Sequence, residues 1–129
     1  MKIMLDTSAY VGFKRNTAEA VEIIVKAELI IFSPVVMGEL MFGFRNGTRF
    51  KENMDDLDRF LKHDVVDLLP IGKITSDRYS RIAVKLRQQG TPIPTNDIWI
   101  AAQAMEQGAE LITSDQHFDK ISGLVYTIF

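Results

Sequence analysis

Two stretches in the second half of the chain decide the fold: Ile93-Pro94-Thr95-Asn96-Asp97-Ile98-Trp99-Ile100-Ala101-Ala102 and Leu111-Ile112-Thr113-Ser114-Asp115. The first is typical of a helix start that carries one acid, Asp97, in its first turn. The second is typical of a buried strand that is followed closely by another acid, Asp115. In a doubly wound α/β sheet, ligands bind outside the carboxyl ends of the strands. Both acids are therefore expected to point into the usual binding site.

The remaining sequence alternates between short apolar runs and amphipathic stretches. Apolar runs predict strands at residues 2–5, 29–32, 65–69, 110–113 and 124–128. Helical spacing predicts helices from about 7 to 14, after Thr17, after Ser33, at 50–62, from a Thr75 cap to about 89, and from a Thr95 or Asn96 cap to Gly108. This alternation predicts one α/β domain over residues 1–129, a three-layer α/β/α sandwich around a mainly parallel sheet of about four to five strands.

Composition excludes several classes of protein. The chain has 129 residues, of which 47% are hydrophobic and 25% charged, and its net charge of −2 leaves no global electrostatic footprint for nucleic acid. A bound cation would reverse the sign of an acidic site, so a nucleic-acid substrate stays open. The absence of cysteine excludes disulfides, thiolate metal sites and cysteine nucleophiles. No run approaches the ~20 apolar residues of a membrane-spanning helix, and we expect a cytoplasmic protein.

Four acids are candidates for a site, although each also has a structural interpretation. Asp6 could cap the first helix, Asp97 could be favoured by the helix dipole, and Asp115 could begin a turn. Capping cannot explain Glu39, which lies in the second turn of the helix that begins at Ser33-Pro34. Glu39 either lies on a solvated face or binds a cation, and the sequence leaves both interpretations open.

Taken together, the four acids indicate a metal site. In the expected topology Asp6, Glu39, Asp97 and Asp115 converge at the carboxyl edge of the sheet. Carboxylates so close together repel one another and take up protons unless a cation is present. Hard oxygen ligands suit Mg²⁺ or Mn²⁺, and magnesium commonly binds carboxylates together with a substrate phosphate. The sequence thus favours phosphate-ester chemistry.

The same residues carry a resemblance to a known family. Asp6-Thr7-Ser8, Glu39-Leu40-x-x-Gly43, Asp97-x-x-Ile100-Ala101-Ala102 and Thr113-x-Asp115-x-x-Phe118 resemble the four sequence blocks of PIN-domain ribonucleases. Size and spacing are similar, more narrowly, to the VapC toxins of type II toxin–antitoxin pairs. Each block alone is a weak motif, whereas four in order over nearly the whole chain are specific.

The resemblance implies a function and partners. Asp6, Glu39, Asp97 and Asp115 match the family's metal-site acids, and Thr113 matches the hydroxyl residue that supports the last acid. The implied activity is Mg²⁺-dependent or Mn²⁺-dependent endoribonuclease cleavage of RNA phosphodiesters. The implied partners are a second copy of the chain and a small VapB-type antitoxin that covers the acidic site.

Two other functional classes compete with this interpretation. A phosphotransferase or receiver-like domain also has an acid after its first strand. Haloacid-type phosphatases need a second aspartate two residues on, where this chain has Ser8, and receiver domains usually start with paired acids, which are absent here. A catalytically silent PIN-like scaffold for protein binding is the main alternative. It has no need to hold four repelling carboxylates, and would bind Mg²⁺ weakly and leave RNA intact.

Several further residues have open roles. Four basic residues lie just past the first two acids and are well placed to meet phosphates: Lys14, Arg15, Arg45 and Arg49. The basic residues of the helix after Thr75 are expected to form a solvated face instead: Arg78, Arg81 and Lys85. Trp99 could belong to the core, to a dimer interface or to a base-stacking platform. His117 is expected at the surface or behind the metal ligands, and Asp119 at the surface.

Overall fold

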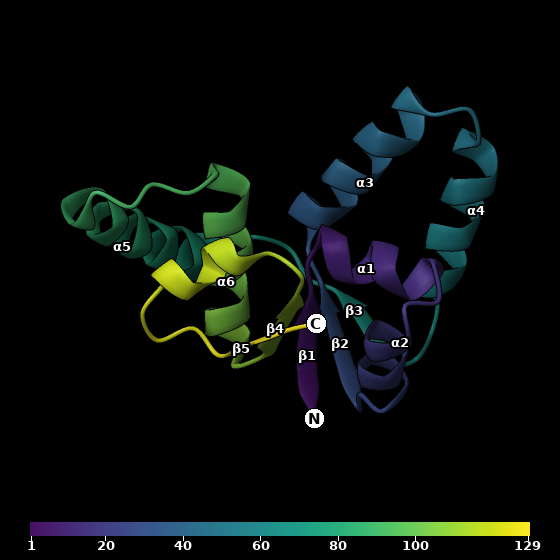
Figure 1. Ribbon diagram of the computed structural model, residues 1–129, viewed down its shortest axis with the longest axis horizontal. Coiled ribbons are helices and arrows are strands. Elements are labelled where there is room, and N and C mark those ends of the chain that lie inside the picture. The colour runs from purple at the N-terminus through teal and green to yellow at the C-terminus, as the bar shows by residue number, and fades with distance from the viewer.

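The computed structural model describes residues 1–129, and its centre is a five-stranded sheet in which every neighbouring pair is parallel (Figure 1). The strand order is β3-β2-β1-β4-β5. The strands are β1 (Lys2–Leu5), β2 (Leu29–Phe32), β3 (Val66–Leu68), β4 (Glu110–Thr113) and β5 (Tyr126–Ile128). The predicted α/β fold with a parallel sheet is confirmed.

The three central strands are the most apolar part of the chain because helices cover both of their faces. Ile3, Met4 and Leu5 of β1 are fully buried, as are Leu111 and Ile112 of β4. Strands buried on both faces are expected to be continuous apolar runs rather than alternating ones. The polar residues that directly follow these runs therefore mark the edge at which the core ends.

The helices divide between the two faces of the sheet. They are α1 (Thr7–Lys14), α2 (Ala18–Val25), α3 (Pro34–Asn46), α4 (Phe50–Leu61), α5 (Lys73–Gln89), α6 (Thr95–Gln107) and the short 3₁₀ helix η1 (Gln116–Lys120). Figure 1 shows α1 to α4 on one side of the sheet and α5 and α6 on the other. Right-handed crossovers produce this division when the chain first extends the sheet from β1 to β3 and then returns to add β4 and β5.

The topological switch point lies between β1 and β4. From β1 the chain proceeds to β2 on one side, whereas β4 is added later on the other side. Met4 is paired with Leu111 and Leu5 with Ile112, so the two strands end side by side. In open α/β sheets the crevice at this point is the usual ligand site. Asp6 follows β1 directly and Asp115 lies two residues beyond β4, so both face it.

Two predicted helix caps are wrong. Helix α5 begins at Lys73 after an extended Gly72, and Thr75 lies inside the first turn, where its hydroxyl accepts a hydrogen bond from the Gly72 N–H at 3.2 Å. Helix α6 begins at Thr95 after Pro94, whose carbonyl accepts the N–H groups of Asp97 and Ile98. Thr95 and Asn96 are thus first-turn residues, and the amide of Asn96 donates to Glu39 of α3.

The other boundaries agree with the predictions to within two residues at each end. The exception is η1, which no sequence pattern predicted and which begins directly after Asp115. No helix combines the length and the apolar composition that crossing a membrane requires.

Candidate active site

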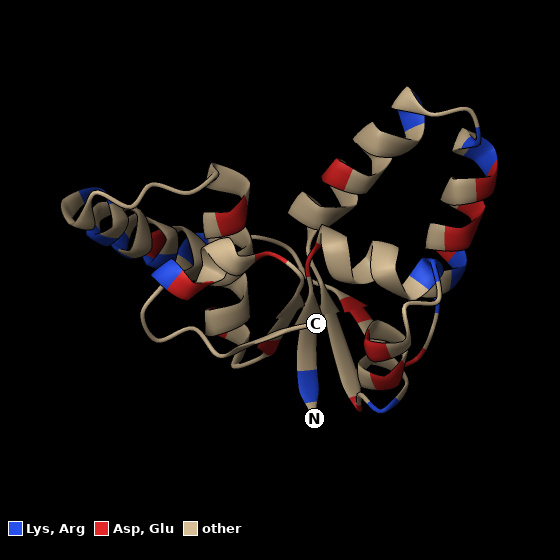
Figure 2. Ribbon diagram, viewed as in Figure 1, with Lys and Arg blue, Asp and Glu red and all other residues tan.

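The four candidate acids surround the switch point. Figure 2 shows acidic segments at the ends of β1 and β4, in α3 and at the start of α6, all around the centre of the molecule. They come from four elements that are far apart in sequence. The topology of the sheet, rather than any local motif, brings them together.

Asp6 is the most deeply buried of the four, with 6% of its surface exposed. It is the N-cap of α1: Oδ1 accepts hydrogen bonds from the N–H of Ala9 at 2.9 Å and from the Ser8 hydroxyl at 2.6 Å. Burial raises the pKa of Asp6 and the charge of Asp115 raises it further, while hydrogen bonds from Ser8, Thr113 and Ala9 lower it. The capping interpretation is therefore correct, and it leaves Oδ2 directed away from the cap.

Thr113 connects the first and last acids. Its buried hydroxyl donates to Oδ2 of Asp6 and accepts the N–H of Asp115 at 2.9 Å. One side chain thus orients a carboxylate after β1 and the backbone that carries the acid after β4. The supporting role expected of Thr113 stays a prediction, and these two hydrogen bonds are the contacts that it would use.

Glu39 lies in the second turn of α3, half-buried, and both of its oxygens have partners. The Thr7 hydroxyl donates to Oε1 at 2.6 Å, and the Asn96 amide donates to Oε2 at 3.3 Å. These bonds join α3 to α1 and to α6. The Glu39 carboxylate is therefore held by both neighbouring helices at a partly exposed position.

Asp97 lies in the first turn of α6, and its pKa is raised by burial and by the charges of the other three acids. Partial burial raises its pKa to about 6, and the negative charges of Asp115, Glu39 and Asp6 contribute in that order, while His117 acts in the opposite direction. An acid beside three like charges resists ionisation. The charges of the other three acids thus add to the effect of burial in keeping Asp97 protonated to a higher pH.

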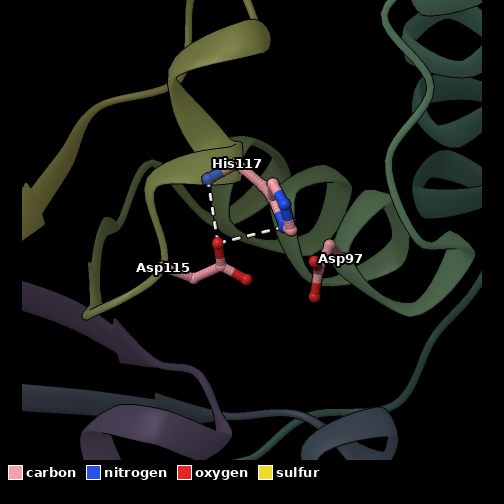
Figure 3. Close-up of side chains that lie close together, drawn as sticks. All are labelled: Asp97, Asp115 and His117. Atoms are coloured by element: carbon pink, nitrogen blue, oxygen red, sulfur yellow. Dashed lines mark hydrogen bonds and ion pairs between the residues drawn. The ribbon is translucent and has the colours of Figure 1, made fainter.

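Asp115 caps η1 and is paired with a histidine. Its Oδ1 accepts the N–H of His117 at 2.9 Å and lies 3.1 Å from His117 Nδ1 (Figure 3). One ligand atom each from Asp97, Asp115 and His117 lie within 4.8 Å of one another. Asp6 and Glu39 are outside that tightest group. His117, which sequence analysis placed at the surface or behind the ligands, lies at the rim of the cluster, with 60% of its side chain exposed.

The donor set fits a hard divalent cation. No lysine or arginine is paired with any of the four acids, and Asp115 has only the His117 contact. Some other acids of the chain do have such partners, as Asp77 has Arg81. Four carboxylates without a cationic partner cost free energy unless a cation binds among them.

Comparison with known proteins agrees with this geometry. The PIN-domain family model matches residues 3–124. The chain belongs to the PIN-domain family. It is 30% identical over 129 residues to ribonuclease VapC1 of Haemophilus influenzae strain R2866, covering 96% of this chain and 95% of the relative. It is 27% identical over 130 residues to ribonuclease VapC2 of Rickettsia felis, covering 97% and 96%.

Solved structures lead to the same family. This PIN domain superposes on VapBC2 of Rickettsia felis, solved bound to a promoter DNA fragment, with a TM-score of 0.86, 26% identity and coverage of 99% of this chain and 98% of that chain. The resemblance to VapC toxins expected from the four sequence blocks is confirmed.

Three side chains that donate to acids of the PIN-domain site were not predicted from the sequence. Thr7 and Asn96 donate to Glu39, and Ser8 donates to Asp6. Ser8 lies two residues from the acid that it contacts, so local spacing could have indicated it. Thr7 and Asn96 lie 32 and 57 residues from Glu39 and had no such signal.

The remaining candidates lie outside the cluster. Asp119 is exposed and lies 3.9 Å from Lys120, as predicted for a surface residue. Trp99 stacks on Tyr79 of α5, with ring centroids 4.1 Å apart and planes inclined by 21°. One face of its indole is therefore covered by Tyr79, within the contact between α5 and α6.

Proposed function

We propose that this PIN domain is a metal-dependent endoribonuclease that acts as the toxin of a VapBC-type toxin–antitoxin pair. The observation that carries the proposal is the group of four carboxylates at the β1/β4 switch point, none of which is paired with a lysine or arginine. The names of the two relatives, ribonuclease VapC1 and VapC2, support RNA as the substrate. The Rickettsia VapBC2 structure supports a VapB-type antitoxin as partner. A homodimer remains the expected assembly.

Each side chain would have a defined task. Asp6, Asp97 and Asp115 would hold the principal ion, Mg²⁺ or Mn²⁺, with Glu39 completing the site. A bound ion would polarise the phosphate and lower the pKa of a coordinated water. Thr113 keeps Oδ2 of Asp6 in place, and Thr7 and Asn96 keep Glu39 turned toward the crevice. His117 orients Asp115 at the rim.

The test is cleavage of total RNA by the purified protein with Mg²⁺, with Mn²⁺ and with EDTA. Asp97→Asn is the inactive variant, and Asp119→Asn removes an exposed acid of the same region as the matched control. We expect discrete fragments that require metal, that persist in Asp119→Asn and that disappear in Asp97→Asn. Intact RNA with the wild-type protein, in every metal, would favour a catalytically silent binding scaffold.

A further inference from the structure

The tightest group of potential metal ligands in this PIN domain contains a histidine. One ligand atom each from Asp97, Asp115 and His117 lie within 4.8 Å of one another, and Figure 3 shows the His117 ring close to both carboxylates. The four sequence blocks that carry the family resemblance supply the site with acids. The imidazole is therefore a potential ligand for which those blocks do not account.

The fold holds His117 in this position through its backbone. Asp115 is the N-cap of η1, and its Oδ1 accepts the N–H of His117 at 2.9 Å. The next residue, Phe118, is fully buried and anchors η1 in the hydrophobic core. The His117 side chain itself is exposed, and its Nδ1 lies 3.1 Å from Oδ1 of Asp115. The ring is thus fixed at its backbone end and open to ions from solvent.

Free ligand atoms are concentrated on the same three side chains. Both oxygens of Asp6 accept hydrogen bonds from the protein, and so do both oxygens of Glu39. The Asp97 side chain accepts none, only Oδ1 of Asp115 has a partner, and the His117 ring contacts no charged group other than Asp115. An ion therefore competes with the fewest hydrogen bonds when its ligands are Asp97, Asp115 and His117.

The separation between His117 and Asp115 suits two neighbouring ligands of one ion. A metal ion binds imidazole nitrogen and carboxylate oxygen at about 2.0–2.2 Å, so two such atoms at a right angle are about 3 Å apart. Nδ1 and Oδ1 are 3.1 Å apart in this structure. A hydrogen bond between them has the same length, so only a measurement of metal binding separates a ligand from an ion-pair partner.

We propose that His117 is a nitrogen ligand of the ion held by Asp97 and Asp115, and that it makes the site prefer Mn²⁺ to Mg²⁺. Mg²⁺ takes oxygen ligands and keeps several of its waters. Imidazole suits transition ions, so one nitrogen ligand adds affinity for Mn²⁺ with little gain for Mg²⁺. This inference rests on the proposed function, because it concerns the choice of ion at the same site.

The experiment measures metal binding rather than cleavage. Isothermal titration calorimetry gives the Kd of Mn²⁺ and of Mg²⁺ for the wild-type protein and for His117→Gln. The matched control is His63→Gln, which replaces the only other histidine, an exposed residue between α4 and β3. Electron spin echo envelope modulation of bound Mn²⁺ detects coupling to the nitrogen nucleus of a ligand. Melting curves in EDTA check that both variants fold.

His117→Gln should raise the Kd of Mn²⁺ about tenfold and change the Kd of Mg²⁺ by less than about threefold, because it removes a nitrogen ligand and no oxygen ligand. His63→Gln should leave both values within about twofold of the wild type. Nitrogen coupling to Mn²⁺ should be present in the wild type and in His63→Gln, and absent from His117→Gln.

An ion-pair role alone predicts a different result. A histidine that only neutralises Asp115 competes with the ion, so its replacement would leave the affinity for Mn²⁺ unchanged or increase it, and the wild type would show no nitrogen coupling. That outcome, with metal-dependent cleavage of RNA retained, would overturn the assignment of His117 and not the proposed function. A wild-type protein that binds neither ion would overturn both proposals.

Discussion

Thr113 donates its hydroxyl hydrogen to Oδ2 of Asp6 across 107 positions of sequence, at the point where β1 and β4 end side by side. The hydroxyl oxygen of Thr113 in turn accepts the N–H of Asp115. One hydroxyl therefore fixes the position of two acids on neighbouring strands. A group that uses its donor and its acceptor in this way is difficult to replace with an apolar side chain of the same shape.

Thr113→Val should reduce metal-dependent RNA cleavage by about 10–100-fold, the range typical of groups that support metal ligands. Valine keeps the volume but neither donates to Asp6 nor accepts from Asp115. Thr113→Ser should recover most of the activity because it keeps the hydroxyl. The measurement is the cleavage rate at saturating Mg²⁺, and equal rates for the valine and serine variants would contradict the role of the hydroxyl.

Asp97 should make the metal-free protein less stable as pH rises. Its folded pKa is about 6 against an ordinary value of 3.8, so the folded state holds the proton more tightly than the unfolded state. The stabilisation is fully present below pH 3.8 and is lost as pH rises through about 6. The full shift would correspond to roughly 3 kcal/mol, and solvent screening at this half-buried position reduces it to about 1 kcal/mol.

The measurement is the free energy of unfolding in EDTA at pH values from 4 to 8, with Asp97→Asn as the reference. Groups that do not interact with Asp97 contribute equally to both proteins, so the difference between the two curves reports Asp97 together with its coupling to the neighbouring carboxylates. Between pH 4 and 7 we expect the free energy of unfolding of the wild type to fall relative to that of the asparagine variant. Parallel curves would show that Asp97 does not feel the neighbouring carboxylates.

Divalent cations should stabilise the folded protein through the same carboxylates. A ligand that binds only the folded state, at a hundredfold excess over its Kd, contributes roughly 2.7 kcal/mol. For a domain of this size that is an increase in Tm of about 10 °C. Mg²⁺ or Mn²⁺ should therefore raise the wild-type Tm, and Asp6→Asn and Asp97→Asn should lose most of the increase. Asp119→Asn should keep it, and an equal increase in all variants would place the cation elsewhere.

Three of the four acids of the site could be singled out from the sequence around them. Asp6 and Asp115 could be placed because each follows an apolar run that forms a parallel strand, and strands adjacent to the switch point end together. Glu39 could be singled out because a charge among apolar neighbours has no local explanation. These inferences depend on the hydrophobic pattern and on the topology that it implies, and both can be inferred from the sequence.

The starts of α5 and α6 differ from the predictions because Gly72 and Pro94, rather than a polar residue, stand at the N-cap positions. Their carbonyls accept the first helical N–H groups. Thr75 and Asn96 consequently lie in the first turns, where their side chains donate to acids of other helices. Because the preference for Ser, Thr, Asp or Asn at an N-cap is not followed here, that preference alone placed both helix starts too late.

The unpaired hydroxyl of Tyr10 gives the last prediction. The ring is buried and packed against Phe32 and Phe60, burial raises its pKa to about 12 with a further contribution from Asp56, and the hydroxyl has no partner. A buried polar group without a partner costs about 1–3 kcal/mol. Tyr10→Phe should therefore leave the free energy of unfolding unchanged or raise it by up to about 1 kcal/mol. Tyr10→Leu, which removes the ring edges, should lower it by about 2–3 kcal/mol. Urea unfolding of the three proteins measures both effects, and a phenylalanine variant as unstable as the leucine one would mean that the hydroxyl, rather than the ring, holds α1 against the core.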